Sequence, residues 1–245
     1  MGVIRLGILG GFTGKVGAVI GAIVNGECII TSLHNTSSRT DQSSASTVQI
    51  ASDGDAPGVL FAQVSSASKD AEYSKQDVQR TKMILVTAFL RPIVPYLRLG
   101  FQEKAINKTE YNIALAYNIK HAAMEDEEGN KYLAFSKALV SMGNLPNAVH
   151  DASLQLGRNS VDFIWTNNSE LACASDNDIS LPLLFNTDNL QAVYDLEGAR
   201  RHEERTALRV PAHWRGNTMV AFLAFASEDR KRTSNSIYLG SFLAQ

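Results

Sequence analysis

The side chains best suited to metal binding or acid–base chemistry are five histidines, and their spacing supports neither role. None of them pairs with a second histidine in a metal-binding helix motif, and none lies at metal-ligand spacing from Cys28 or Cys173. Serine and aspartate are plentiful, but the G-x-S-x-G turn of a nucleophilic serine does not occur. The sequence therefore predicts no enzyme activity, no cofactor and no metal site. The histidines are His34, His121, His150, His202 and His213.

Two clusters of charged residues could bind ions or nucleic acid. The run 176–178 (Asp-Asn-Asp) offers hard oxygen ligands for calcium, but the remaining spacing of a calcium loop is missing. Basic residues gather at 200–205 and 230–232, where acidic neighbours largely cancel their charge. Because contacts to phosphates need a net positive surface, we expect no nucleic-acid partner. The basic residues are Arg200, Arg201, His202, Arg205, Arg230, Lys231 and Arg232, and the acidic ones are Glu203, Glu204, Glu228 and Asp229.

The opening segment is rich in glycine and has two features of nucleotide-binding loops. Gly10–Gly17 follows an apolar run, as in a dinucleotide fold, but 18–24 consists mostly of β-branched residues and glycine, which are poor helix formers. A phosphate loop needs glycine five positions before its Gly-Lys pair and serine or threonine after it, whereas Leu9 and Val16 stand there. Neither nucleotide-binding loop is therefore expected.

A β-hairpin fits this opening segment better. Asn25-Gly26 is the preferred pair for a two-residue turn, and it separates Lys15–Val24 from Glu27–Leu33. A nearly uncharged, glycine-rich strand pair either covers the protein's own core or pairs with other chains, and both alternatives stay open. The residues predicted to form an assembly interface are Gly10, Gly11, Gly14, Gly17, Gly21, Asn25 and Gly26.

The bulk composition is that of a soluble globular protein. The chain has 245 residues, 44% hydrophobic and 20% charged, with a net charge of −2. No run reaches the roughly 18 apolar residues of a membrane span, so none is predicted. No clear secretory signal is found. We expect synthesis in the cytoplasm and leave open a later incorporation into a particle or an extracellular assembly.

The segment 35–70 is rich in serine and reads as an insert carrying a second hairpin. Two short apolar runs, Thr47–Ala51 and Val59–Val64, flank a turn-rich centre. A helix is then predicted from about residue 75, ended or kinked by Pro92, and Thr109 can cap a further helix that runs to about Met124.

From Tyr132 onward the apolar residues recur with a period of two, which is typical of strands. The alternation of Val220, Phe222 and Ala224 with apolar neighbours predicts a strand covered on both faces. We therefore expect a β-rich α+β protein, with a hairpin and two to three helices over residues 1–130 and an antiparallel β-sandwich over 131–245. The predicted strands are Tyr132–Ser141, Ser153–Leu156, Val161–Thr166, Ile179–Phe185, Ala192–Leu196, Thr206–Val210, Met219–Ser227 and Ser236–Leu243.

Several segments, taken in order, resemble an uncharacterised family of Bacteroidetes proteins with a GGFSGKVG-like opening and a closing YLG motif. The resemblance implies an N-terminal hairpin with helices and a C-terminal immunoglobulin- or fibronectin-like sandwich. It implies no activity, since the family carries no established catalytic residues. The matching segments are Gly10–Gly17, Ala88–Ile93, Leu97–Phe101, Tyr111–Lys120, Lys137–Pro146, Val210–Trp214 and Ser234–Gly240.

These observations predict a non-enzymatic structural protein that self-assembles through its glycine-rich hairpin, as a filament, tube or particle subunit. Strand addition between copies needs few specific side chains, and a head-to-tail contact that does not close generates a fibre. The partner is then a second copy of the chain. The alternative is a monomeric or dimeric binding module whose sandwich loops recognise a glycan or another protein.

Overall fold

The computed structural model describes the backbone of six strands before residue 66. It then describes residues 75–244, except 128, 149–151, 158 and 171–172. Side chains are described from Val78 onward. The described chain is a β-rich α+β fold, and its strands form antiparallel sheets. It divides into two compact units, an N-terminal unit (Met1–Ala45) and a main unit (Ser46–Gln245). This division differs from the boundary at residue 130 that the sequence suggested.

The N-terminal unit is a sheet with the strand order β1-β2-β3-β4. β3 and β4 pair in antiparallel register, with Val24 opposite Glu27. The run 15–24 does not form one strand as expected, because β2 ends at Val16 and β3 begins at Val19. The strands are β1 (Val3–Ile4), β2 (Phe12–Val16), β3 (Val19–Val24) and β4 (Glu27–Ser32).

The helical layer of the main unit begins with α1 (Lys75–Leu90) and α2 (Val94–Gly100). Between them lies a short 3-10 helix, η2 (Arg91–Ile93), at the proline that was predicted to kink the chain. The third helix, α3 (Glu110–His121), starts after Thr109, whose hydroxyl accepts a hydrogen bond from the amide of Asn112. The predicted proline kink and threonine cap are therefore confirmed.

A four-stranded sheet, in the order β5-β6-β8-β7, accompanies these helices. The predicted second hairpin is present, since β5 and β6 pair in antiparallel register. The expected strand from Tyr132 to Ser141 is shorter, because a 3-10 helix, η4 (Phe135–Lys137), follows β8. The expected helix to Met124 ends at His121, because the next residues form β7. The strands are β5 (Thr47–Ser52), β6 (Val59–Ser65), β7 (Ala123–Glu125) and β8 (Lys131–Ala134).

Two further sheets complete the main unit, in the orders β13-β10-β9 and β12-β11-β14-β15. Their strands lie within about two residues of the predicted bounds. They are β9 (Ser153–Leu156), β10 (Ser160–Ile164), β11 (Ile179–Asn186), β12 (Gln191–Tyr194), β13 (Arg205–Arg209), β14 (Thr218–Ala226) and β15 (Ile237–Leu243).

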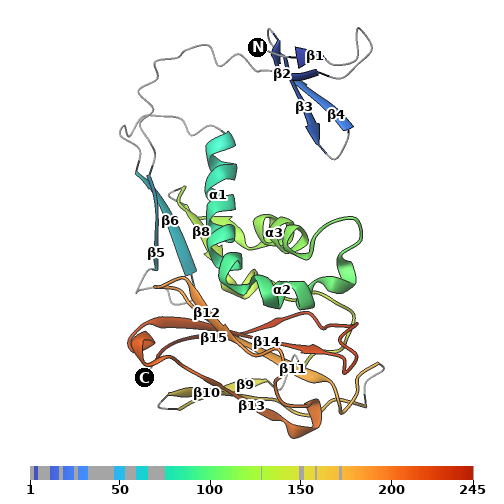
Figure 1. Ribbon diagram of the computed structural model, residues 1–245. Helices are drawn as coiled ribbons and strands as arrows, with labels where there is room; N and C mark the ends of the chain where they lie inside the picture. Colours follow the sequence, from blue (N-terminus) through green and yellow to red (C-terminus); the bar gives the residue numbers. More distant parts are fainter. Residues whose placement is uncertain are drawn as a thin grey trace. The chain divides into compact units, whose positions relative to one another are not determined.

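The sheet β12-β11-β14-β15 lies between two hydrophobic cores, with the helices on one face and the β13-β10-β9 sheet on the other (Figure 1). Along β14, Val220, Phe222 and Ala224 belong to the helix-side core, whereas Leu223 and Phe225 belong to the opposite core. The prediction of a strand covered on both faces is confirmed, and the sheet forms the middle layer of the main unit.

The helical stretch Val78–Gly100 is long and apolar enough to cross a membrane by length and composition alone. The sequence expectation concerned uninterrupted apolar runs, whereas this stretch qualifies by its mean hydropathy, so the absence of a membrane span stays a prediction. In the fold this stretch supplies core residues such as Leu85, Phe89 and Leu97, all fully buried. That burial is typical of a core helix of a globular protein.

Candidate functional site

The seven residues predicted to form an assembly interface fall in the N-terminal unit. Gly14 of β2 and Gly21 of β3 lie directly opposite each other in the sheet. At this one cross-strand position the pair has no Cβ atoms, and glycines inside a strand often mark a place where another backbone approaches closely. The other five, Gly10, Gly11, Gly17, Asn25 and Gly26, lie outside the described residues, as do His34 and His150.

The two charged clusters that the sequence singled out meet in the interior. Arg201 is fully buried, and its Nε donates to Oδ2 of Asp178 at 3.0 Å. The guanidinium also donates to the carbonyl of Pro146 and to Asn168, and lies 4.1 Å from the ring centroid of Phe225. Burial lowers the pKa of Arg201, and the Asp178 carboxylate opposes that shift. Arg201 and Asp178 thus form an internal ion pair.

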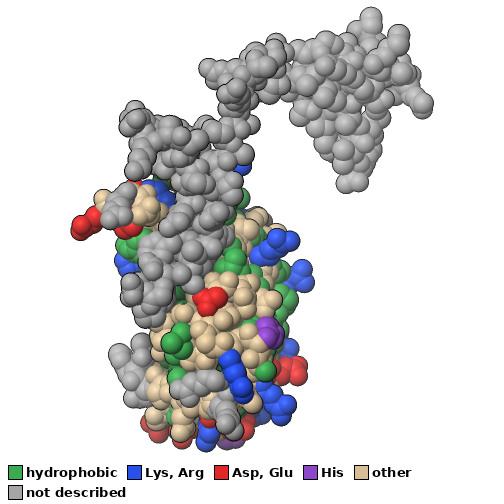
Figure 2. Space-filling model, turned by 90° about the vertical axis from the view of Figure 1, so that its left-hand side faces the viewer, with side chains coloured by type: hydrophobic (Ala, Val, Ile, Leu, Met, Phe, Trp, Pro, Cys, Tyr) green, Lys and Arg blue, Asp and Glu red, His purple; other side chains and the backbone are tan. Residues whose placement is uncertain are grey.

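Exposed basic residues of those clusters form ion pairs with acidic side chains from other parts of the chain instead of forming one basic patch. Arg200 forms an ion pair with Glu228 at 3.0 Å, and Arg230 forms one with Glu197 at 2.7 Å. Figure 2 shows basic and acidic side chains interspersed toward the lower end of the visible face of the main unit. Within the described residues, no group of three His, Cys, Asp or Glu side chains could hold a metal ion.

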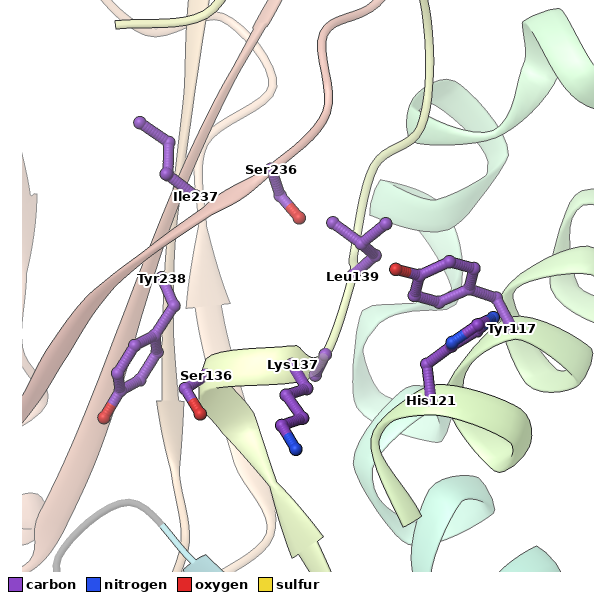
Figure 3. Close-up of a pocket in the computed structure, with 9 residues that line it drawn as sticks. Tyr117, His121, Ser136, Lys137, Leu139, Ser236, Ile237 and Tyr238 are labelled. Carbon is purple, nitrogen blue, oxygen red and sulfur yellow. The ribbon is translucent and has the colours of Figure 1, made fainter. Parts of the chain in front are cut away.

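A well-defined hollow lies where α3, η4 and the start of β15 meet. Its volume is about 430 Å³, within the usual range for small-molecule sites. Figure 3 shows Tyr117 and His121 of α3 on one side, Tyr238 on the other, and Lys137 between them. The remaining lining residues are Ser136, Ala138, Leu139, Ser236 and Ile237.

The wall of this hollow formed by residues 137–141 is fixed on both sides by hydrogen bonds. On the helix side, the buried amide of Asn118 accepts from Leu139 N at 3.0 Å and donates to Leu139 O at 2.8 Å. On the sheet side, the Ser236 hydroxyl accepts from Val140 N at 3.0 Å, and Ser236 N donates to Ser141 O at 3.0 Å. The hollow is therefore bounded by a fixed backbone, which we name the 137–141 strap.

The polar side chains that line the hollow make few hydrogen bonds to the rest of the protein. The rings of Tyr117 and His121 lie one helical turn apart, with centroids separated by 4.5 Å. Lys137 donates only to the weak acceptor Met124 Sδ, at 3.2 Å. Within the described residues, no hydrogen bond is made by the hydroxyls of Tyr117, Tyr238 and Ser136, and no acidic side chain lines the hollow. The hollow is a donor-rich, partly aromatic site.

The sequence analysis did not predict this hollow, because its residues come from three distant segments. None of the three segments holds a chemical motif at recognisable spacing. A signal was nevertheless present, since Tyr111–Lys120, Lys137–Pro146 and Ser234–Gly240, three segments that carry the family resemblance, each contribute lining residues.

Replacing Asn118 by alanine is expected to destabilise the main unit by about 2–3 kcal/mol, because the amide and carbonyl of Leu139 lose their partner in a buried place. Urea unfolding followed by circular dichroism measures the change. Asn112→Ala, at an exposed position of the same helix, is the matched control, with a change of less than about 0.5 kcal/mol expected. Equal effects at the two positions would contradict the role of Asn118 as a clamp.

The fold and the hollow define a β-rich α+β protein whose helices cover one face of a central antiparallel sheet. The chain belongs to a family of unknown function, DUF6266, whose model matches residues 44–240. The glycine-rich segment 10–17 lies before the matched range. No curated protein and no solved structure gives a significant match to the chain.

Proposed function

We propose that this is a non-enzymatic structural protein that self-assembles through its N-terminal unit, as the subunit of a filament, tube or particle. The observation that carries the proposal is a separate four-stranded sheet in residues 1–45, with β1 and β4 as its outer strands. Within this sheet each outer strand pairs on one side only. An unpaired strand edge is a template for another chain.

The edge of β4 is the better docking edge of the two. It is six residues long, against two for β1, and Glu27 is its only charged residue. Natural edge strands that must stay unpaired are short, charged or interrupted by proline, and β4 has only its one glutamate. A second copy that adds a strand at this outer edge gains main-chain hydrogen bonds with little demand on side chains.

We also infer that the two C-terminal sheets form an immunoglobulin- or fibronectin-like sandwich. Three strands in one sheet and four in the other, with a shared core between them, support this inference. The resemblance to Bacteroidetes proteins also supports the sandwich. The Bacteroidetes origin itself stays a prediction, because the family match concerns only the family of unknown function. In this arrangement the main unit is the body of the subunit, and residues 1–45 are its connecting element.

The test is a proline in β4 of the full-length chain. The two-residue connection makes Val24 and Glu27 a hydrogen-bonded pair, so alternation predicts that the amides of Cys28, Ile30 and Ser32 point away from β3. Ile30→Pro therefore removes an outward donor without removing a bond to β3. Light scattering over a concentration series, with negative-stain microscopy, measures assembly. We expect the variant to need at least about tenfold more protein than the wild type.

The matched control is Ile30→Val, which keeps the amide and the strand preference and should assemble like the wild type. Circular dichroism checks that each variant keeps its fold. A wild-type chain that stays monomeric at every accessible concentration overturns the proposal. Assembly of Ile30→Pro at wild-type concentrations would show that β4 is not the docking edge.

A further inference from the structure

The hollow between α3, η4 and β15 has more hydrogen-bond donors than the protein itself uses. Lys137, Ser136, Tyr117 and Tyr238 all line it, and in the described chain none of them is paired with an acid. The one acidic residue of the neighbouring strand β7, Glu125, forms an ion pair with Lys131 at 2.5 Å. The open donors therefore face a region without negative side chains, which favours an acceptor-rich, anionic ligand.

The charge of the site fits one negative group and not several. Lys137 is the only lysine among the lining residues, and arginine, whose fork holds phosphate well, is not among them. The site also lies at the C-terminal end of α3, where the helix dipole is negative. Lys120 and His121 in the last turn offset that dipole but leave little surplus for a dianion.

The shape of the site fits a ring. Tyr117 and Tyr238 reach it from opposite elements, a helix and a strand, and the ring of His121 extends the aromatic surface on the helix side (Figure 3). Aromatic walls with polar tips bind flat ligands that carry hydroxyl groups. The 137–141 strap holds Leu139 and thereby fixes the distance between the two walls. Little ordering of the site is needed on binding, which lowers its cost.

From these contacts we propose that the hollow binds a small carboxylic acid whose single carboxylate is carried on a six-membered ring. The carboxylate is held by the ammonium group of Lys137 and the hydroxyl of Ser136, and the ring lies over the 137–141 strap, with Tyr117 on its helix side and Tyr238 on its sheet side. The same chemistry is offered by a sugar acid and by an aromatic acid. This binding site does not depend on assembly through the N-terminal unit.

The test is saturation-transfer NMR on the full-length protein, which works whatever the assembly state. The probes are D-glucuronate, its neutral counterpart D-glucose and 4-hydroxybenzoate, and inorganic phosphate, which has no C–H protons to observe, is added as a competitor. For a ligand of about a dozen non-hydrogen atoms we expect a dissociation constant on the order of 1 mM. Lys137→Gln should weaken the acid about tenfold, the size of one charge-assisted hydrogen bond. The control is Lys120→Gln, in the last turn of α3 but outside the lining of the hollow. It should change the dissociation constant of the acid less than twofold.

Binding of glucuronate but not glucose, lost with Lys137→Gln, supports the proposal with a sugar acid as the ligand. The same pattern for 4-hydroxybenzoate supports it with an aromatic acid. The proposal is overturned if neither acid binds below about 10 mM, if an equal concentration of phosphate displaces half of the bound acid, or if Lys120→Gln weakens binding as much as Lys137→Gln. Tyr117→Leu, with an expected loss of about fivefold, tests the ring contact separately.

Discussion

Replacing Asp178 by alanine is expected to destabilise the main unit by about 3–5 kcal/mol, because the substitution leaves the fully buried Arg201 without its counter-charge. The remaining partners, the carbonyl of Pro146 and the amide oxygen of Asn168, are neutral and cannot replace a carboxylate. Asp178 also accepts from the amide of Ser175, so the turn before β11 loses a bond as well. Urea unfolding at neutral pH measures the change.

The neighbouring surface pair supplies the matched control for this experiment. Glu228→Ala removes the exposed partner of Arg200 and should cost less than about 1 kcal/mol. A double variant, Asp178→Leu with Arg201→Met, should be less destabilised than Asp178→Ala, because an apolar pair leaves no charge buried alone. If Asp178→Ala changed the unfolding free energy no more than Glu228→Ala, the ion pair would have no structural role.

Replacing Phe89 by alanine is expected to cost about 3–5 kcal/mol, since this side chain fills the centre of the helix-side core. Its ring meets Phe135 at a centroid distance of 5.2 Å and Phe185 at 5.0 Å, both edge to face. It also lies 6.0 Å from Phe222 of β14. Removing the ring leaves a cavity at the contact between α1 and the middle sheet, and thermal and urea unfolding both report the loss.

Met83 gives the control within the same helix. Its side chain is 51% exposed, so Met83→Ala removes a large apolar group from water without opening a cavity. We expect a change of less than about 1 kcal/mol. Should Phe89→Ala and Met83→Ala cost the same, α1 would not be packed on the sheet through Phe89.

The strands and helices of the main unit were largely predictable, since local pattern determines them. Alternation located β9 to β15 within about two residues, and the proline after Leu90 and the cap at Thr109 placed the helix ends. What the pattern could not show is pairing between distant segments. Residues 131–134 alternate like the strands that follow, yet one of their two partners is β6, more than sixty residues earlier.

The functional interpretation of single residues was weaker for the same reason. Asp178 was considered as a calcium ligand and Arg201 as part of a basic patch, because each was judged by its neighbours in sequence. Folding brings the two side chains together as a buried ion pair, so neither is exposed at the surface. Tyr117, Lys137 and Tyr238 have no common motif, so their shared hollow is visible only in three dimensions.

The helices α1 and α2 precede the strands of the middle sheet, β12-β11-β14-β15, in the sequence. This order has a consequence during synthesis. The apolar stretch Val78–Gly100 is made first, and β14, which covers it, begins more than a hundred residues later at Thr218. At about 5–20 residues per second, translation leaves that stretch without its cover for on the order of 10 s. During this interval the nascent chain presents a segment that meets the length and hydropathy of a membrane span. We therefore expect the yield of the protein in cells to depend on chaperones that shield such segments.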